Sequence, residues 1–406
     1  MPRETIRPII DFLRTDGHVL SGPDSLDPLV TRLLSSQVVL LGESTHGTHE
    51  FYDIRAQITK RLIQEGDRPA FIAVEADWPD CTQANRYVKG HPNAPASAPE
   101  ALVNITPFGS WKLANEETVE LLEWVRAYNF DHPFERRVGF YGLDMQNPLN
   151  KSCKQMLDFL KEMDPRVVAD LIGTETDWFK IFPIMKDLLE RRQSNYRGRD
   201  ADGLFATFRN ASVINTKNSL TPQPAENYNK IRDNHMFATL QHLMKLYKGE
   251  AQAIVWAHNT HVGDERHTRS QNSGYVFGQL ARDAFGDAVT LVGFDTDHGS
   301  VIAVPPNDPY RMTHMRVPPS HDGSWGNVFH QSGGNRVVIF DSTIDLPVLH
   351  EIRDQRAIGL KYNSLQDRGV YVPTVLPKRY DAVVHVDTSS ALHPLDKNEL
   401  NRELPI

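Results

Sequence analysis

The residues with the clearest chemical potential follow a short apolar run, Val38–Leu41. The next residues read Gly-Glu-Ser-Thr-His-Gly, so a carboxylate, Glu43, and an imidazole, His46, stand close together in the chain between glycines. A carboxylate that accepts a hydrogen bond from one imidazole nitrogen fixes the tautomer of the ring and makes the other nitrogen more basic. We therefore interpret this segment as part of an active site, with His46 as the candidate general base.

A helical pattern follows this segment, with apolar residues at helical spacing from Phe51 to Leu62. The positive end of a helix dipole disfavours an imidazolium ion, so we expect His46 to be neutral and able to accept a proton. Ser44 lies in a segment similar to the nucleophile elbow Gly-x-Ser-x-Gly, but His46 replaces the second glycine. We therefore expect Ser44 to be a hydrogen-bonding or capping hydroxyl rather than a nucleophile.

Further apolar runs also end in ionisable groups. These groups are Glu75, Asp77, His258 and His261. In open α/β sheets, ligands bind beyond the carboxyl ends of the strands, where neighbouring parallel strands meet at one edge. If the strands lie side by side, all of these side chains face one crevice together with the Glu-x-x-His pair.

Structural interpretations compete with the catalytic one. His46 could satisfy the backbone of a turn, and Glu43 and Glu75 could cap helices or form ion pairs with Arg55 or Arg232. In these alternatives, the side chains contribute to the stability of the fold rather than to catalysis.

The paired histidines raise the question of a metal. His258 and His261 have the same spacing as His46 and His49, and two histidines so spaced can bind one zinc ion. The alternative is hydrogen-bond donation to a substrate carbonyl or oxyanion. Because the sequence fixes no third ligand and contains no P-loop or dinucleotide fingerprint, we predict neither a bound metal nor a cofactor.

Short apolar, β-branched runs predict the strands of the fold. They occupy residues 38–41, 70–75, 137–144, 253–258, 289–294, 300–304, 336–341 and 381–386. Helical patterns separate most of them, which indicates a mostly parallel central sheet flanked by helices. We expect residues 290–304 to form an antiparallel pair around a turn at Asp295–Gly299. Residues from about 150 to 250 look helical, and we interpret them as an insertion over the active-site cleft within a single α/β domain that spans 1–406.

The composition argues against large charged partners. The formal net charge is -8 over 406 residues, which disfavours nucleic acid or an anionic membrane surface as the main partner. No apolar run approaches the roughly 20 residues of a membrane-spanning helix. With two cysteines and no signal peptide at the start, we expect a cytoplasmic protein, and the sequence gives no indication of its oligomeric state.

Taken together, these segments resemble the erythromycin esterase family. The first segment matches that family's Gly-Glu-x-x-His-Gly signature. Further similar blocks, in the same order, are Val74–Asp80, Asn85–Val88, Arg232–Met236, Trp256–Asp264, Arg356–Gly359 and Tyr380–His385. The resemblance extends from about residue 37 to about residue 387.

The resemblance implies a hydrolase that opens the lactone ester of macrolides such as erythromycin, without a general need for metal. His46 would activate water without a covalent intermediate, and Glu43 and Glu75 would orient His46 or the water. The residues implied in charge balance and in facing the carbonyl are Arg55, Arg232, His258 and His261. The expected partner is thus a small-molecule ester or macrolide. The alternatives are a metal-assisted hydrolase of another ester and a non-catalytic, ligand-binding member of the family.

Overall fold

The computed structural model of the chain describes residues 3–103, 105, 111–146, 148–219, 225–268, 275–307, 311–341, 343–395 and 401–402. Its centre is a sheet with the strand order β1-β8-β11-β6-β2-β5-β3-β4. The parallel strands are β2 (Val38–Leu41), β3 (Ala70–Asp77), β4 (Gly139–Asp144), β5 (Gln252–Trp256), β6 (Val289–Ala303) and β11 (Ala382–Ser389). The predicted fold class, a mostly parallel sheet flanked by helices, is confirmed.

Antiparallel strands complete the sheet at one end. They are β8 (Arg336–Ile339), β1 (His18–Val19) and β7 (Thr313–Val317), and β7 also pairs with the short strand β12 (Asn401–Arg402). A separate hairpin consists of β9 (Arg353–Arg356) and β10 (Tyr371–Thr374).

Helices cover both faces of the sheet. One layer contains α2 (Asp27–Leu34), α3 (His49–Glu65), α4 (Thr82–Lys89), α5 (Ala98–Leu102) and α6 (Glu116–Phe130). The other contains α1 (Arg3–Thr15), α11 (Ala225–Leu246), α12 (Asn259–Val262), α13 (Phe277–Phe285), α14 (Trp325–Ser332) and α15 (Leu376–Arg379).

Strand β2 shows how the two layers share the sheet. Its side chains alternate, with Val39 and Leu41 in the first core and Val38 and Leu40 in the second. Each of these side chains is fully buried, and such burial stabilises the fold by about 1.5–3 kcal/mol per residue.

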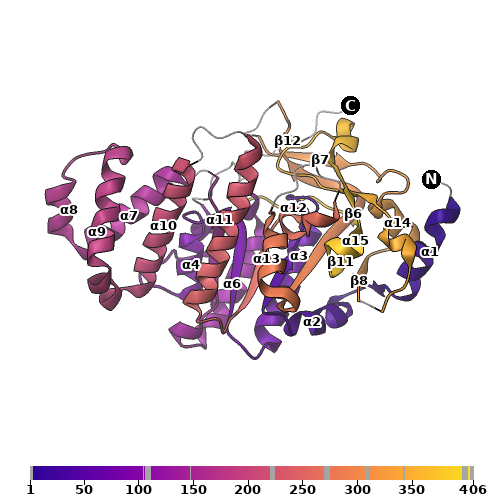
Figure 1. Ribbon diagram of the computed structural model, residues 1–406, viewed down its shortest axis with the longest axis horizontal. Helices are drawn as coiled ribbons and strands as arrows, with labels where there is room; N and C mark the ends of the chain where they lie inside the picture. The colour runs from indigo at the N-terminus through magenta and orange to yellow at the C-terminus, as the bar shows by residue number, and fades with distance from the viewer. Residues whose placement is uncertain are drawn as a thin grey trace.

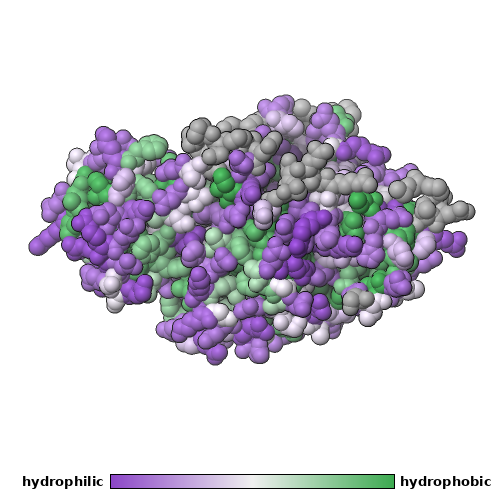
Figure 2. Space-filling model, in the orientation of Figure 1, coloured by the Kyte–Doolittle hydropathy of each residue, from purple (hydrophilic) through white to green (hydrophobic). Residues whose placement is uncertain are grey.

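The helical stretch between β4 and β5 builds a lobe at one end of the molecule, opposite the end where α1 and α14 lie (Figure 1). The lobe consists of α7 (Leu149–Met163), α8 (Pro165–Leu171), α9 (Trp178–Arg199) and α10 (Ala201–Ser219), which enclose a core of their own. Figure 2 shows hydrophilic side chains over much of its outer end, formed by α8 and α9. The last helix of the stretch, α11, leaves the lobe and packs beside β4.

The prediction of an antiparallel pair within residues 290–304 is wrong, because β6 is a single strand. The polar stretch from Asp295 to Gly299 resembles a turn in sequence. In the structure it stays paired with β11, from Asp295 opposite His385 to Gly299 opposite Ser389. The antiparallel partner of the end of β6 is β7.

Among the helices of the described residues, none combines the length and the apolar character that crossing a membrane requires.

Candidate active site

Two glycines allow the loop after β2 to pass close to atoms of neighbouring elements. A side chain at Gly42 would collide with the Asn259 amide and with the Val292 carbonyl, and one at Gly47 would collide with the Ile302 backbone. The loop therefore lies in close contact with α12 and β6, which explains why glycines frame the motif.

A carboxylate joins the histidine and an arginine within this loop. Glu43 Oε1 lies 2.6 Å from His46 Nδ1, and Glu43 Oε2 lies 2.7 Å from Arg55 Nη2. The Arg55 guanidinium is fully buried over the rings of Tyr52 and Trp256, at 4.4 and 4.6 Å from the ring centroids. Arg55 is therefore fixed in place, and it holds Glu43 against the imidazole.

The charges around this pair keep the carboxylate ionised and the imidazole neutral. Burial raises the pKa of Glu43, but Arg55 and the His46 hydrogen bond lower it to about 2. Burial and the Lys112 cation lower the pKa of His46, against the opposing effect of Glu43. Neutral His46 therefore donates Nδ1–H to Glu43, and its Nε2 carries the lone pair that a general base needs.

Glu75, at the end of β3, is the second centre of the cluster. Its Oε1 accepts from Arg232 Nη2 at 2.7 Å and lies 3.1 Å from Lys112 Nζ, while its Oε2 accepts from the His258 backbone N–H at 2.8 Å. Burial raises the pKa of Glu75, but Lys112, His261 and Arg232 together lower it well below its ordinary value. Glu75 is thus a buried anion that binds cations and a backbone N–H from distant parts of the chain.

Arg232, on α11, bridges several acidic side chains. Its Nε and Nη2 donate to Asp144 at 2.9 and 2.6 Å, and its Nη1 lies 2.9 Å from His261 Nε2. His261 Nδ1 lies 2.7 Å from Asp233 Oδ1. Burial lowers the pKa of His261, but Asp233 and Glu75 raise it above its ordinary value.

His258 lies beside His46, with ring centroids 4.7 Å apart, but both of its nitrogens are engaged. Its Nδ1 accepts from the Thr260 N–H at 3.3 Å as the N-cap of α12, and its Nε2 lies 3.1 Å from the Ile358 carbonyl oxygen. Burial lowers the pKa of His258 to about 3. A contact between His258 and a substrate carbonyl would therefore require its bond to Ile358 to open.

The structure brings all of the predicted site residues into one connected cluster. They are Glu43, His46, Arg55, Glu75, Arg232, His258 and His261. The ion pairs Glu43–Arg55 and Glu75–Arg232, proposed as structural alternatives, are both present. Asp77, predicted to face the same crevice, instead accepts from the backbone N–H of Gln146.

Sequence reasoning missed three members of the cluster. A signal was present for two of them, because Asp144 ends a predicted strand and Asp233 is adjacent to Arg232 in the sequence. Lys112 had no such signal, because it belongs to a short 3-10 turn outside every recognised pattern.

A strap of the C-terminal segment, residues 389–395, supports the loop from outside. The His49 N–H donates to the Ser390 carbonyl at 2.9 Å, and the Leu392 N–H donates to the Gly47 carbonyl at 3.0 Å. Glu117 Oε1 lies 2.6 Å from His49 Nδ1 and 2.7 Å from His393 Nδ1. The strap is thus joined to the loop of His46 and to the start of α6.

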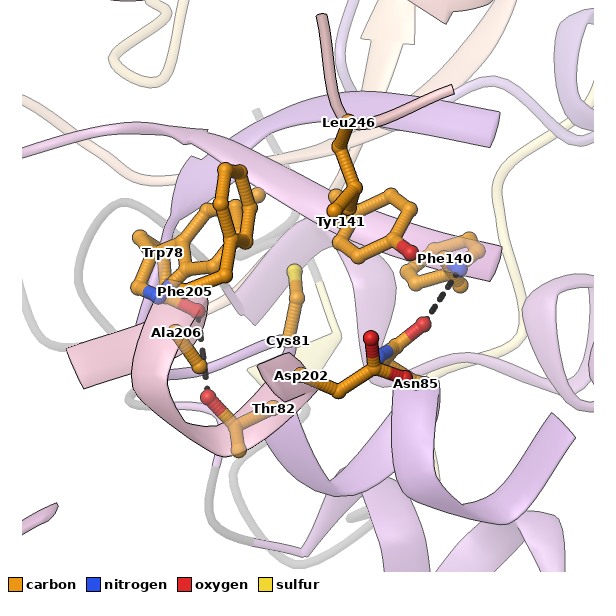
Figure 3. A pocket seen from close by; sticks show the side chains of 11 residues that line it. Trp78, Cys81, Thr82, Asn85, Phe140, Tyr141, Asp202, Phe205, Ala206 and Leu246 are labelled. Carbon is orange, nitrogen blue, oxygen red and sulfur yellow. Dashed lines mark hydrogen bonds between the residues drawn. The ribbon is translucent and has the colours of Figure 1, made fainter. Parts of the chain in front are cut away.

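An apolar pocket lies to one side of this cluster, between β4, α4 and the helical lobe (Figure 3). The Trp78 ring stacks on Tyr141 at 5.8 Å and meets Phe205 edge-on. Trp78 thus lines an apolar pocket, and the lining includes no member of the charged cluster.

Fold and cluster together define an α/β protein with a buried histidine–carboxylate centre at the carboxyl edge of its parallel sheet. Residues 70–389 match the erythromycin esterase family, so the chain belongs to that family. The matched range includes Glu75, Arg232, His258 and His261, whereas the segment with Glu43 and His46 precedes it.

Solved structures of the same fold cover nearly the whole chain. A protein from Bacillus cereus shares 20% identity and a TM-score of 0.77, covering 96% of this chain and 99% of its own. A succinoglycan biosynthesis protein shares 20% identity and a TM-score of 0.76, covering 97% of this chain and 100% of its own. A mutant of the erythromycin esterase EreC, in its open conformation, shares 15% identity and a TM-score of 0.62, covering 97% and 98%. At these identities the likeness is one of fold.

Proposed function

We propose that this chain is a carboxylic ester hydrolase, with macrocyclic lactones as the first candidate substrates and His46 as the base that activates water. The observation that carries the proposal is the Glu43–His46 pair. Nδ1 of the histidine is occupied by the carboxylate at 2.6 Å, and Nε2 has no hydrogen-bond partner among the described residues. Family membership supports ester hydrolysis as the reaction class.

In the proposed reaction, His46 Nε2 takes a proton from a water molecule as its oxygen attacks the ester carbonyl carbon. The negative charge that develops on the carbonyl oxygen is stabilised by the cations of the cluster, Lys112 and Arg232. The carbon–oxygen bond of the ester then breaks, and His46 returns its proton to the leaving alkoxide. A positioned base of this kind contributes about 10²–10⁴ in rate.

A metal-assisted hydrolase is the second candidate. Donor atoms of Glu43, His46 and Glu75 lie within 4.8 Å of one another, so an ion could be placed among them. However, the carboxylates already face cations, Arg55 at 2.7 Å from Glu43 and Lys112 at 3.1 Å from Glu75. A divalent ion would add charge to a cluster that its own side chains neutralise, which favours the metal-independent reaction.

The test is mass spectrometry of a macrolide panel incubated with the purified chain. Wild type should add one water, about 18 Da, to a substrate, and His46→Asn should not, although it keeps the same fold by circular dichroism. Wild-type turnover that survives exhaustive chelation supports the metal-independent route, and turnover lost on chelation and restored by zinc supports the second candidate.

Unchanged masses across macrolides and a wider ester and lactone panel would contradict the hydrolase proposal. Tight binding of a panel compound without turnover would instead support a ligand-binding member of the family.

A further inference from the structure

A second group of histidines and carboxylates lies apart from the candidate active site. Asp297 and His298 belong to β6, Asp387 belongs to β11, and His330 belongs to α14. Helix α14 packs against both strands at the end of the molecule opposite the helical lobe (Figure 1). Three elements that are distant in sequence thus bring their imidazoles and carboxylates to one place.

The donor atoms of Asp297, His298 and His330 all lie within 4.8 Å of one another, which is close enough for one metal ion, and Asp387 adjoins them through His330. Asp297 Oδ2 lies 3.0 Å from His298 Nδ1 and 3.7 Å from His330 Nδ1, and His330 Nδ1 lies 2.8 Å from Asp387 Oδ1. Tetrahedral zinc with bonds of about 2.0 Å keeps its ligand atoms roughly 3.3 Å apart. Because these donor atoms lie within 4.8 Å of one another, side-chain movements of at most about 1.5 Å would bring them to the separations of zinc ligands.

A buried pair behind the cluster provides an independent sign. His385 and Asp295 are both completely buried, and none of their side-chain nitrogens or oxygens has a hydrogen-bond partner among the described residues. His385 Nε2 points toward Asp387 Oδ1 at 3.5 Å, and its Nδ1 lies 3.4 Å from Asp295 Oδ2. In metal sites, a second layer of polar groups typically lies against the carboxylate ligand and orients it.

The surroundings fit an ion that exchanges with solvent. The Asp297 side chain is 2% exposed, whereas that of His330 is 47% exposed, so the cluster has a buried anionic floor and an open side. The His385 ring is held flat against Phe329, with 4.8 Å between centroids and 12° between planes. The ring orientation toward Asp387 is therefore fixed by packing.

We propose that Asp297, His298, His330 and Asp387 form a binding site for one divalent transition-metal ion, with zinc as the first candidate. Imidazole and carboxylate donors in this combination suit zinc, cobalt, nickel and manganese better than the hard ions calcium and magnesium. The ion joins β6, β11 and α14, and His385 with Asp295 forms its outer layer. The site is separate from the proposed esterase chemistry.

Besides the candidate active site, one further group of the described residues, His49, Glu117 and His393, places its donor atoms within 4.8 Å of one another. It differs because both imidazoles lie at hydrogen-bonding distance from one oxygen, Glu117 Oε1, at 2.6 and 2.7 Å, whereas His330 Nδ1 lies 3.7 Å from Asp297 Oδ2. That arrangement is explained by hydrogen bonds alone, so it serves as the matched control.

The experiment measures zinc bound to the whole chain after treatment with a chelator and dialysis against zinc chloride, by elemental mass spectrometry and titration calorimetry. His330→Ala and Asp387→Asn should each bind one zinc ion fewer than wild type at about 1 μM free zinc. His385→Gln should retain the ion with an affinity weaker by about 10–100-fold. Glu117→Gln, the control, should bind it as wild type does. His330 is half exposed on a helix, so alanine there preserves the fold.

Cobalt supplies a second readout, since a tetrahedral site with histidine ligands gives visible absorption bands that His330→Ala should abolish. The proposal is overturned if wild type binds no zinc under these conditions. It is also overturned if His330→Ala and Asp387→Asn both bind as much zinc as wild type, or if the ion is lost in Glu117→Gln but kept in His330→Ala.

Discussion

Glu43 and His46 are joined by a 2.6 Å contact between Oε1 and Nδ1, across one turn of a loop that glycines frame. The contact fixes which nitrogen of the imidazole carries the proton, and Arg55, on the other carboxylate oxygen, prevents Glu43 from taking that proton itself. The pair resembles the carboxylate–histidine half of a catalytic triad, and in the proposed reaction water takes the place of the serine nucleophile.

The first prediction concerns this contact. Glu43→Gln should lower kcat by about 10²–10⁴ with little change in KM, because the amide no longer stabilises the imidazolium that forms during proton transfer. Steady-state kinetics on the substrate found by mass spectrometry checks it. The control is Glu65→Gln at the end of α3, whose side chain pairs with Arg61 far from the cluster. Equal kinetics for Glu43→Gln and wild type would show that His46 does not act as a base oriented by Glu43.

In the proposed reaction, Lys112 should set the pH range of activity through its effect on the pKa of His46. Burial and Lys112 lower the pKa of His46, so the acid limb of kcat/KM in wild type should lie below pH 6.5, the ordinary value of the group. Lys112→Met removes a positive charge, which favours the imidazolium ion, and the acid limb should move to higher pH. The profile of Lys154→Met, an exposed lysine of α7, should coincide with that of wild type. A downward shift for Lys112→Met would contradict the assignment.

The sequence was enough to predict the site residues that lie at the ends of strands. Glu43, Glu75 and His258 each follow an apolar run, and parallel strands β2, β5 and β3 lie side by side, so these residues converge as expected. Lys112 could not be found this way. Lys112 lies in a segment without hydrophobic periodicity and contacts Glu75 only because of how the chain folds. Such tertiary contacts leave no local pattern in the sequence.

One interpretation failed for a similar reason. The polar stretch at Asp295–Gly299 has turn chemistry, but pairing with β11 along its length keeps it extended. The geometry of His258 was also not predictable from its motif, because the ring contacts the carbonyl of Ile358, a residue distant in sequence.

Arg232 should be essential for stability as well as for the site. Arg232→Met leaves Asp144 buried without its main cation and removes one of the cations of Glu75, which should lower the free energy of unfolding by about 3–5 kcal/mol. Urea denaturation followed by circular dichroism measures the change. Arg191→Met removes an exposed ion pair with Asp187 and should cost at most about 1 kcal/mol. Equal losses in the two variants would mean that the buried pairs of Arg232 contribute no more than a surface pair.

Ser44 tests whether an acyl-enzyme forms. Its Oγ is buried and has no hydrogen-bond partner among the described residues, so no base is in place to activate it. Ser44→Ala should therefore keep nearly full activity, and mass spectrometry of wild type during turnover should detect no covalent adduct. Loss of activity in Ser44→Ala with an intact fold, together with an adduct on wild type, would replace water with Ser44 as the nucleophile.

The strap of residues 389–395 should loosen with pH in a defined direction. Burial lowers the pKa of His49, but its bond to Glu117 raises it above 6.5, whereas that bond lowers the pKa of Glu117 below 4.5. The His49 contribution is complete below pH 6.5 and is lost as the pH rises through its folded pKa. The Glu117 contribution is complete above pH 4.5 and is lost as the pH falls through its folded pKa. The strap should therefore be most stable between about pH 4.5 and pH 6.5.

Hydrogen exchange reports on this strap directly, through the backbone N–H groups of His49 and Leu392 that bind Ser390 and Gly47. After correction for intrinsic rates, both amides should be better protected at about pH 5.5 than at about pH 8. Glu117→Gln should reduce the protection and abolish its pH dependence, because a neutral amide gains nothing from a charged imidazole. Glu120→Gln changes an exposed residue of the same helix and should leave the exchange unaltered. The same pH dependence in Glu117→Gln as in wild type would show that another group governs the strap.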